Sequence, residues 1–262
     1  MVSANLCEVF TSVEGEGVFA GRPAVFVRLA GCNLQCTYCD TPRARRRTAE
    51  AEVDSGPVRN PVELDRLVSI VADLASGRGG APQVPVVVFT GGEPLVQADF
   101  VGAAARSLRM LGLRAHLETN GSLPEAFVGV RSALDFVSMD LKLPSSQGGR
   151  SLWDEHLAFL AALSGKQAAL KVVIAPETSL GEIDHAARLV AGVNRFLPVV
   201  LQPAFEEAVA EGPEPSGGSG RTRGRARPAV DARVMMDALA AARARLYDVR
   251  LSVQMHKVLG VK

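Results

Sequence analysis

The sequence predicts an α/β protein built on a sheet of six parallel strands covered by helices. The first observation is a series of six short apolar runs, rich in Val, Ile and Phe and bounded by Gly, Pro or polar residues. The second is that helical stretches separate these runs, which gives the alternating order of β/α units. Several runs are apolar on both faces, as expected for parallel strands covered by helices. The periodicity is compatible with an open sheet and with an incomplete barrel.

The predicted strands follow one another along the chain. They are Ala24–Ala30, Val84–Thr90, Arg114–Thr119, Leu134–Leu141, Ala168–Ala175 and Val199–Pro203. A last strand is predicted at Val249–Met255, where apolar and polar side chains alternate. Functional loops are expected at the carboxyl ends of the parallel strands.

The clearest helix is predicted over Asn60–Ser76. Asn60 is a suitable N-cap, Pro61 fits the first turn, and Glu63 stands three residues after the cap. The apolar stripe of this helix consists of Leu64, Leu67, Val68, Val71 and Leu74. The other helices are predicted at Gln97–Leu111, Leu152–Leu163, Glu182–Asn194 and Asp231–Leu246.

One segment, Glu211–Pro228, interrupts this alternation. It reads EGPEPSGGSGRTRGRARP and contains no side chain suited to a hydrophobic core. We expect a flexible insertion, 211–228, within a single domain that spans residues 1–262. Its arginines are expected to be solvated, and the same is expected of Arg43, Arg45, Arg46 and Arg47.

Composition and charge limit the class of protein. A chain of 262 residues can bury a substantial core. The 29 basic and 28 acidic side chains give a net charge of +1, which offers no electrostatic case for a nucleic-acid partner. Four cysteines are too few for a disulfide scaffold. Because no secretory leader and no apolar run of about 20 residues is visible, we expect a cytoplasmic protein without a membrane partner.

Three cysteines stand on one short loop directly after the first predicted strand. Cys32, Cys36 and Cys39 form GCNLQCTYC, a C-x3-C-x2-C spacing. Three thiolates on a tight loop can hold three corners of a 4Fe-4S cluster and leave the fourth iron open to a small chelating molecule. A structural zinc ion is the alternative, but it normally needs a fourth ligand. Cys7 is distant in sequence and is expected to be an ordinary half-buried thiol.

A second motif follows the next predicted strand. In Thr90-Gly91-Gly92-Glu93-Pro94, the two glycines allow a ligand to approach the backbone, whose carbonyls can accept from an ammonium group. One β/α unit after the cysteine loop, this motif resembles the radical S-adenosylmethionine superfamily. The resemblance implies that S-adenosylmethionine chelates the open iron and is cleaved to a 5′-deoxyadenosyl radical. Tyr38 occupies the position where this superfamily favours an aromatic residue against the adenine.

Further motifs narrow the resemblance. The first part of the chain carries Ser12–Gly17 (SVEGEG), Gly21-Arg22-Pro23, Phe26–Leu29, Gly31–Leu34 and Cys39-Asp40-Thr41. The rest carries Glu118–Gly121, Asp140-Leu141-Lys142, Pro144-Ser145-Ser146, Leu201-Gln202-Pro203 and Gln254–Lys257. In this order the motifs resemble the 7-carboxy-7-deazaguanine synthase family over nearly everything outside Arg43–Arg59 and Glu211–Pro228. The implied fold is an abbreviated, TIM-like β/α barrel of about six parallel strands with outer helices, usually a homodimer.

The resemblance implies a ring-contracting lyase of queuosine and deazapurine biosynthesis. It would convert 6-carboxy-5,6,7,8-tetrahydropterin to 7-carboxy-7-deazaguanine with loss of ammonia, with flavodoxin or ferredoxin as electron donor. Its cofactors would be the cluster, S-adenosylmethionine and Mg²⁺, the last held by the substrate carboxylate and Thr41. The implied cofactor contacts are Tyr38, Gly91, Gly92, Glu93, Ser145, Ser146 and Gln202. The implied substrate contacts are Glu14, Gly15, Glu16, Arg28, Thr90, His256 and Lys262.

Several of these residues have structural alternatives. A carboxylate can accept the adjacent N–H groups of a pterin, and an arginine suits its acid group, but Arg28 lies in an apolar strand where it could instead pair with a buried carboxylate. The family commonly has glutamine where this chain has Glu14. His256 and the terminal carboxylate of Lys262 are expected near the pterin, the alternative being a solvated chain end.

Other polar residues are given structural or open roles. His116, His156 and His185 are expected to be structural or surface histidines, and Trp153 to pack a helix. Asp140 and Lys142 suit either cofactor contacts or a framework ion pair, and the two serines of the Pro144-Ser145-Ser146 motif suit a turn. Two other functions compete with the lyase: an activase that installs a glycyl radical on a partner protein, and a non-enzymatic zinc-binding protein.

Overall fold

The computed structural model describes residues 2–76, 84–206 and 227–260, and a single large sheet organises them. All six predicted strands are present as β3 (Pro23–Leu29), β7 (Val86–Gly91), β8 (Arg114–Thr119), β9 (Phe136–Asp140), β10 (Gln167–Ile174) and β11 (Val199–Pro203). They lie side by side in chain order, and each pairs in parallel with the next. The prediction of a parallel α/β sheet is therefore confirmed.

Four further strands extend this sheet at its two ends. They are β14 (Val249–Leu251) beside β11, and β2 (Leu6–Val13), β4 (Glu50–Val53) and β5 (Val58–Arg59) beyond β3. The sequence did not predict β2, which runs antiparallel to β3 with Val13 opposite Pro23. The predicted last strand is wrong beyond Leu251, because the chain leaves the sheet there and forms the short helix α7 (Met255–Leu259).

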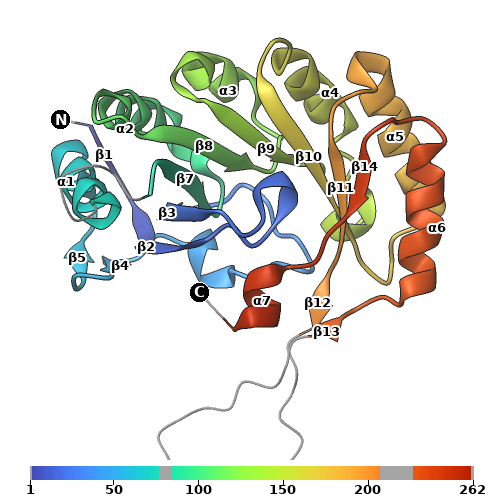
Figure 1. Ribbon diagram of the computed structural model, residues 1–262, viewed down its shortest axis with the longest axis horizontal. Helices are drawn as coiled ribbons and strands as arrows, with labels where there is room; N and C mark the ends of the chain where they lie inside the picture. The colour runs from blue at the N-terminus through green and yellow to red at the C-terminus, as the bar shows by residue number, and fades with distance from the viewer. Residues whose placement is uncertain (1, 77–83, 207–226, 261–262) are drawn as a thin grey trace, which may run out of the picture.

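The helices cover one face of the sheet. Figure 1 shows α1 to α6 arranged as an arc around the outer side of the curved sheet, with α7 on the opposite side. Their bounds are α1 (Leu64–Ala75), α2 (Ala98–Met110), α3 (Pro124–Val130), α4 (Trp153–Ala162), α5 (Leu180–Asn194) and α6 (Ala232–Arg243). The main hydrophobic core fills the space between these helices and the sheet, while a smaller cluster that includes Phe10 and Phe26 packs separately. This is the partial barrel that the sequence motifs imply.

The predicted cap of the first helix is wrong. Asn60 does not cap α1, because its side chain is bound to the backbone of Leu6: Oδ1 accepts from the Leu6 N–H at 3.0 Å and Nδ2 donates to the Leu6 carbonyl at 2.8 Å. Val62–Glu63 instead forms the short strand β6, which pairs with β1 (Ser3–Ala4), and α1 begins at Leu64. A long-range contact of the backbone thus replaces a local cap.

The predicted insertion falls mostly outside the described residues. Only its last two residues, Arg227–Pro228, are described, and they form strand β13, which pairs with β12 (Phe205–Glu206). Within the described part of the chain, no helix is long and apolar enough to cross a membrane.

Candidate active site

The cysteine loop leaves the carboxyl end of β3 and is tied to the rest of the site by side-chain and backbone hydrogen bonds. Cys32, Cys36 and Cys39 are free and half-buried. Gln147 donates a hydrogen bond from Nε2 to Cys36 Sγ at 3.0 Å, and the Thr37 N–H donates to the Ser146 carbonyl at 3.1 Å. Burial raises the pKa of the Cys32 thiol. Among the described residues no three Cys, His, Asp or Glu side chains already form a metal-binding group.

Gly91 and Gly92 lie where the backbone of the cysteine loop crosses the end of β7. A Cβ on Gly91 would stand 2.2 Å from the Leu29 carbonyl oxygen, and one on Gly92 would stand 2.2 Å from the Gly31 carbonyl oxygen. The Gly92 N–H donates to Leu29 at 3.1 Å, and the Glu93 N–H donates to Gly31 at 2.8 Å. The two glycines were expected to let a ligand approach the backbone. In the structure, the backbone of Leu29 and Gly31 occupies this close position, which fixes the cysteine loop on the sheet.

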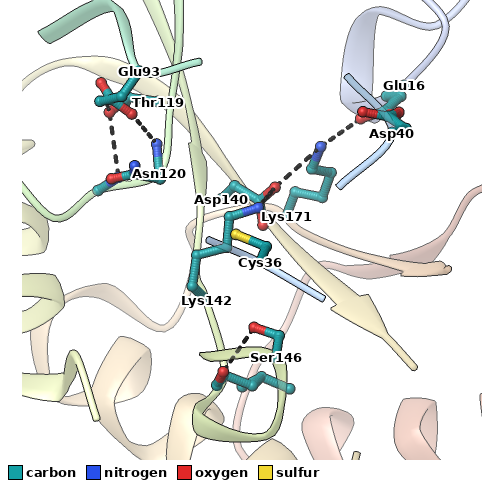
Figure 2. A network of polar contacts seen from close by, with 12 residues as sticks. Glu16, Cys36, Asp40, Glu93, Thr119, Asn120, Asp140, Lys142, Ser146 and Lys171 are labelled. Carbon is teal, nitrogen blue, oxygen red and sulfur yellow. Dashed lines mark hydrogen bonds and ion pairs between the residues drawn. The ribbon is translucent and has the colours of Figure 1, made fainter. Parts of the chain in front are cut away.

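Glu93 organises the next strand end. Its carboxylate is buried and accepts hydrogen bonds from Thr119 Oγ1 at 2.8 Å, from the Leu95 N–H at 3.0 Å and from the Asn120 N–H at 2.7 Å (Figure 2). Burial raises the pKa of Glu93 to about 7, although all three hydrogen bonds favour the charged form. The Glu93 carboxylate, which was predicted to contact the cofactor, thus accepts its hydrogen bonds from groups of the protein itself. Through these bonds Glu93 positions β7 and β8 relative to each other.

Asn120 continues this chain of contacts to the cysteine loop. Its Nδ2 donates to Asn33 Oδ1 at 2.9 Å, Asn33 Nδ2 donates to Ser122 Oγ at 2.8 Å, and Ser122 Oγ donates to Asn120 Oδ1 at 2.6 Å. The buried His156 contributes Nε2 at 3.2 Å from the Asn120 carbonyl. Sequence reasoning did not single out Asn33 or Asn120 as site residues, although both stand inside the quoted motifs.

Asp140 and Lys142 form the ion pair that the sequence left open. Lys142 Nζ lies 2.7 Å from Asp140 Oδ2 and 5.1 Å from the centre of the Tyr38 ring, and Lys171 Nζ lies 3.2 Å from the same Asp140 oxygen. Lys171 also pairs with Glu16, so that it stands between the two carboxylates (Figure 2). Burial would lower the pKa of Lys171, but Asp140 and Glu16 raise it above its ordinary value. The sequence did not single out Lys171.

The end of the described chain returns to this network. Gln254 Nε2 donates to Glu16 Oε1 at 2.5 Å and to Asp40 Oδ2 at 3.0 Å. The Met255 N–H donates to the Gly15 carbonyl at 2.8 Å, and Lys257 Nζ lies 3.6 Å from Asp40. The segment around His256 therefore lies against the predicted substrate residues, while the His256 side chain and Lys262 are outside what the structure describes.

Arg28 pairs with a buried carboxylate, which was the structural alternative. Its Nε donates to Glu8 Oε1 at 2.7 Å, while one terminal nitrogen lies 3.4 Å from Thr41 Oγ1. Arg43 holds the other Glu8 oxygen at 2.6 Å and also pairs with Glu52. Arg43 is nevertheless 48% exposed, so it is solvated as expected while it pairs with these carboxylates. The expectation of a purely solvated side chain is wrong for Arg45, which donates to the carbonyl of Cys36 in the cysteine loop.

The remaining histidines and aromatic residues have structural surroundings. Trp153 packs against the core and lies 4.5 Å from the ring of His185, as expected for a helix-packing tryptophan. His156 is buried, and burial lowers its pKa to about 4. Cys7 is fully buried against Ala30 and Ala44 rather than half-buried, and its surroundings are those of an ordinary structural thiol.

Comparison with known proteins identifies the family. The Radical SAM superfamily model matches residues 27–190. The chain is 40% identical over 206 residues to a 7-carboxy-7-deazaguanine synthase of Geobacter sulfurreducens, a match that covers 76% of this chain and 81% of that relative. It is 38% identical over 213 residues to the enzyme of the same name from Methanopyrus kandleri, covering 76% and 81%. The chain belongs to the 7-carboxy-7-deazaguanine synthase family.

A solved structure has a fold similar to that of this chain. The crystal structure of QueE from Escherichia coli matches with a TM-score of 0.61 at 18% identity, covering 98% of this chain and 96% of that one. At this identity the likeness concerns the fold alone, which is the partial barrel described above.

The predicted cofactor contacts of the synthase include buried oxygen atoms without a partner. Ser145 Oγ and Gln202 Oε1 have no hydrogen bond within the described residues, and neither has Oδ1 of Asp140, whose role the sequence left open. Ser146, by contrast, donates to the Leu143 carbonyl at 2.7 Å and so serves the turn. Buried polar atoms are costly when unpaired, so a bound molecule with ammonium or hydroxyl donors would complete them. Together with three free thiols on one loop, this donor set fits a cluster and S-adenosylmethionine.

Proposed function

We propose that this chain is a radical S-adenosylmethionine lyase that converts 6-carboxy-5,6,7,8-tetrahydropterin to 7-carboxy-7-deazaguanine with loss of ammonia. The observation that carries the proposal is the cysteine loop held against the ends of β7, β8 and β9 in a chain of this family. When bound, the cluster and S-adenosylmethionine supply an electron and a 5′-deoxyadenosyl radical that abstracts hydrogen from the carbon bearing the substrate carboxylate.

The residues of the loop bind and orient the cofactors. Cys32, Cys36 and Cys39 would hold three corners of the cluster, and the hydrogen bond from Gln147 to Cys36 Sγ orients that ligand. Tyr38, within the loop, packs against the small cluster that contains Val173 and Ala175, and we propose that its ring forms the surface for the adenine. Ser145 and Gln202 offer buried oxygen atoms to the hydroxyl and ammonium donors of the cofactor.

The substrate carboxylate has two proposed partners at the end of β3. Arg28 is anchored through Nε on Glu8, and its terminal nitrogen lies beside Thr41. Thr41 Oγ1 in turn lies 3.1 Å from Asp40 Oδ1. A hydroxyl and a carboxylate are oxygen ligands that Mg²⁺ accepts while it keeps waters and a substrate oxygen. We therefore propose that Mg²⁺ binds at Thr41 and that Arg28 neutralises the remaining charge of the carboxylate.

The heterocycle of the substrate is proposed to lie on the concave face of the sheet. Glu16 is held there by Lys171 and Gln254, so its position does not depend on a ligand. Thr90 is buried at the end of β7, directly opposite Arg28 in register. The terminal carboxylate and His256 stay predictions for this face, as do a homodimeric assembly and reduction by a flavodoxin or ferredoxin.

The two competing functions have little support. A structural zinc site needs a fourth ligand, and Cys7 is buried against Ala30 and Ala44 in a small core cluster of its own. An activase of glycyl-radical enzymes shares the cysteine loop, but the motifs that contain Glu16, Thr41 and Gln254 are those of the deazaguanine family, and in the described structure they meet in one network.

Anaerobic reconstitution followed by a product assay tests the proposal. We expect the reconstituted protein to hold iron and sulfide and, with reductant, S-adenosylmethionine and carboxytetrahydropterin, to yield 7-carboxy-7-deazaguanine by mass spectrometry. Cys36→Ala should lose the cluster and the product, whereas the matched variant Cys7→Ala should keep both because Cys7 lies outside the loop. Stoichiometric zinc without iron, or a reconstituted wild type that forms no product, would refute the proposal.

A further inference from the structure

A concentration of positive charge borders the cysteine loop. Residues 31–49 contain one acidic side chain, Asp40, and four basic ones, whereas the whole chain carries a net charge of only +1. The four basic side chains are Arg43, Arg45, Arg46 and Arg47. They stand in and directly after the short 3-10 helix η2 (Pro42–Arg45). This segment lies outside the motifs of the deazaguanine family, so those motifs do not account for its charge.

The four arginines differ in how far the protein compensates their charge. Arg43 lies 2.6 Å from Glu8 and 2.9 Å from Glu52, so two carboxylates balance it. Arg46 and Arg47 are exposed and form no ion pair within the described residues. The uncompensated charge of the segment therefore faces solvent at these two positions.

Hydrogen bonds fix the arginine segment against the cysteine loop. Arg45 donates from Nη2 to the carbonyl of Cys36, one of the three cysteines proposed as cluster ligands. The Gly31 N–H, at the start of the loop, donates to the Ala44 carbonyl at 2.8 Å. Both the start and the middle of the loop are thus bonded to η2, so the exposed arginines that follow η2 keep a defined position beside the loop.

The loop comes to the surface at Cys36. Its two neighbours in the chain, Gln35 and Thr37, are exposed, while Cys36 itself is half-buried. The second segment that contacts Cys36 contains Gln147, whose Nε2 donates to its Sγ at 3.0 Å. Three residues later, Arg150 is 63% exposed and lies 3.9 Å from Glu155, a loose pair. Both segments that contact Cys36 therefore carry exposed arginines.

We propose that Arg46, Arg47 and Arg150, here called the arginine surface, dock an acidic electron carrier of the flavodoxin type, whose electron enters the cluster beside Cys36. The inference rests on the proposed function, which requires reduction of the cluster. One electron passes from the reduced flavin of the carrier to the cluster: the flavin is oxidised by one electron, the cluster is reduced by one, and no proton or group is transferred.

The size and the position of the arginine surface favour such a partner over a nucleic acid. Three arginines on two short segments offer few phosphate contacts, and the affinity of a nucleic acid rises with their number. Electron-transfer encounters are among the smallest specific interfaces, with less than about 1,200 Å² buried. Opposite charges steer such partners together and set their orientation, while the complex stays short-lived.

Binding of a purified flavodoxin to the reconstituted protein tests the arginine surface directly. In the double variant Arg46→Glu/Arg47→Glu, two charges that face solvent are reversed. Its dissociation constant for flavodoxin should rise at least about tenfold at low ionic strength, mainly through slower association. The difference should shrink at high salt, because the Debye length falls from about 10 Å at 0.1 M to about 3 Å at 1 M. Arg150→Glu should weaken binding in the same direction.

The matched control reverses two exposed arginines elsewhere. Arg233 and Arg243 stand on α6, beside β11 and β14 at the opposite end of the sheet from β4 (Figure 1). Arg233→Glu/Arg243→Glu changes the net charge by the same amount as Arg46→Glu/Arg47→Glu. It should bind flavodoxin nearly as tightly as the wild type, because the effect depends on the position of the charge and not on the total.

Turnover with two reductants separates docking from catalysis. With flavodoxin as electron source, below its saturating concentration, Arg46→Glu/Arg47→Glu should form 7-carboxy-7-deazaguanine at least about tenfold more slowly than the wild type. With dithionite, a small reductant that needs no docking surface, the two rates should be nearly equal. Iron content and the cluster spectrum should also be equal, because neither arginine bonds to the cysteine loop.

The outcomes are distinguishable from failure of the proposed function. A wild type that forms no product with dithionite refutes that function, and this inference with it. Product with dithionite but equal flavodoxin binding in Arg46→Glu/Arg47→Glu and in the α6 control overturns this inference alone. So does a wild type that binds no flavodoxin, or an equal loss of turnover with both reductants.

Two further measurements complete the test. Displacement of flavodoxin by an equal concentration of a short single-stranded RNA would show a general polyanion surface and would overturn the inference. If Arg46→Glu/Arg47→Glu does not fold, Arg46→Gln/Arg47→Gln replaces it. This variant removes the two charges without reversing them, and it should lose flavodoxin affinity in the same direction by a smaller factor.

Discussion

Glu93 Oε2 accepts a hydrogen bond from the backbone N–H of Asn120 at 2.7 Å, which joins the end of β7 to the end of β8. Through Asn120 and Asn33 the same contact reaches the cysteine loop. The Glu93 carboxylate therefore fixes the ends of β7 and β8 and the cysteine loop relative to one another. The surface proposed to bind the cluster and S-adenosylmethionine is thus formed by contacts within the protein.

Replacing Glu93 should disturb both stability and cofactor binding. Glu93→Ala leaves the hydroxyl of Thr119 and the N–H groups of Leu95 and Asn120 without their acceptor, so the free energy of unfolding should fall by about 3 kcal/mol. Binding of S-adenosylmethionine should weaken in parallel. Denaturant unfolding and calorimetric titration measure the two effects. Glu125→Ala on the exposed side of α3 is the control, and an equal response of both variants would contradict this role.

A methyl group should not be tolerated at Gly92. In Gly92→Ala the Cβ would stand 2.2 Å from the Gly31 oxygen and 2.6 Å from the Ala44 oxygen, both of them backbone atoms. We expect a loss of several kcal/mol of stability, or a displaced cysteine loop that no longer retains iron. Gly129→Ala, on α3, meets no atom within 4 Å and should be neutral or stabilising. Thermal melts measure the stability of the two variants, and iron content after reconstitution measures whether the cysteine loop still holds iron. If Gly92→Ala and Gly129→Ala were equal in both measurements, the backbone around Gly92 would accommodate the added methyl group and the prediction would be wrong.

Thr41→Ala should reduce the dependence of activity on Mg²⁺. The variant removes the hydroxyl oxygen beside Asp40 and Arg28 but leaves the three cysteines intact. We expect lower turnover, little stimulation by added Mg²⁺ and an unaltered cluster spectrum. Thr41→Ser, which keeps the hydroxyl, should retain the stimulation. Full Mg²⁺ stimulation of Thr41→Ala would rule out the assignment of this residue.

Gln254→Leu should separate substrate binding from cluster assembly. The amide of Gln254 joins the chain end to Glu16 and Asp40, so its loss should raise the Michaelis constant for the pterin by about tenfold, the effect of one hydrogen bond to a charged group. Iron content should stay constant. Exposed Val253→Leu, one residue earlier, is the control. An unchanged Michaelis constant would show that the chain end does not order the substrate face.

The buried His156 should make stability depend on pH. Burial lowers its pKa to about 4 from an ordinary value of 6.5, so the folded protein holds it neutral where the unfolded chain is protonated. Its contribution is fully present above pH 6.5 and is lost as the pH falls toward 4, at up to about 1.4 kcal/mol per pH unit. In His156→Gln the slope of the free energy of unfolding over this range should be smaller. The same slope in both proteins would mean that other groups cause it.

A feature of the fold or the site could be predicted from the sequence where it depends on neighbouring residues, and not where it depends on contacts between residues far apart in the chain. The six parallel strands were predicted because a short apolar run bounded by Gly, Pro or polar residues is a local property of the sequence. The cysteine loop and the Thr90–Pro94 motif were recognisable because chemistry there requires a fixed spacing along the chain. The cap of α1 was predicted wrongly since Asn60 bonds to Leu6, 54 residues away, and no local pattern records that partner.

The sequence by itself determined the fold class and the family, since these depend on periodicity and motif order, and it predicted the three cysteines that we propose as cluster ligands. Only the tertiary structure decided that Glu93 is held within the protein, that Arg28 pairs with Glu8, and that Lys171 reaches Glu16 across 155 positions of chain. It also brought Glu14 beside His116 and left their outer atoms unpaired. The physical reason is that curvature of the sheet gathers side chains from separate strands on one concave face. Burial there strengthens each ion pair and raises the energetic cost of each unpaired polar atom.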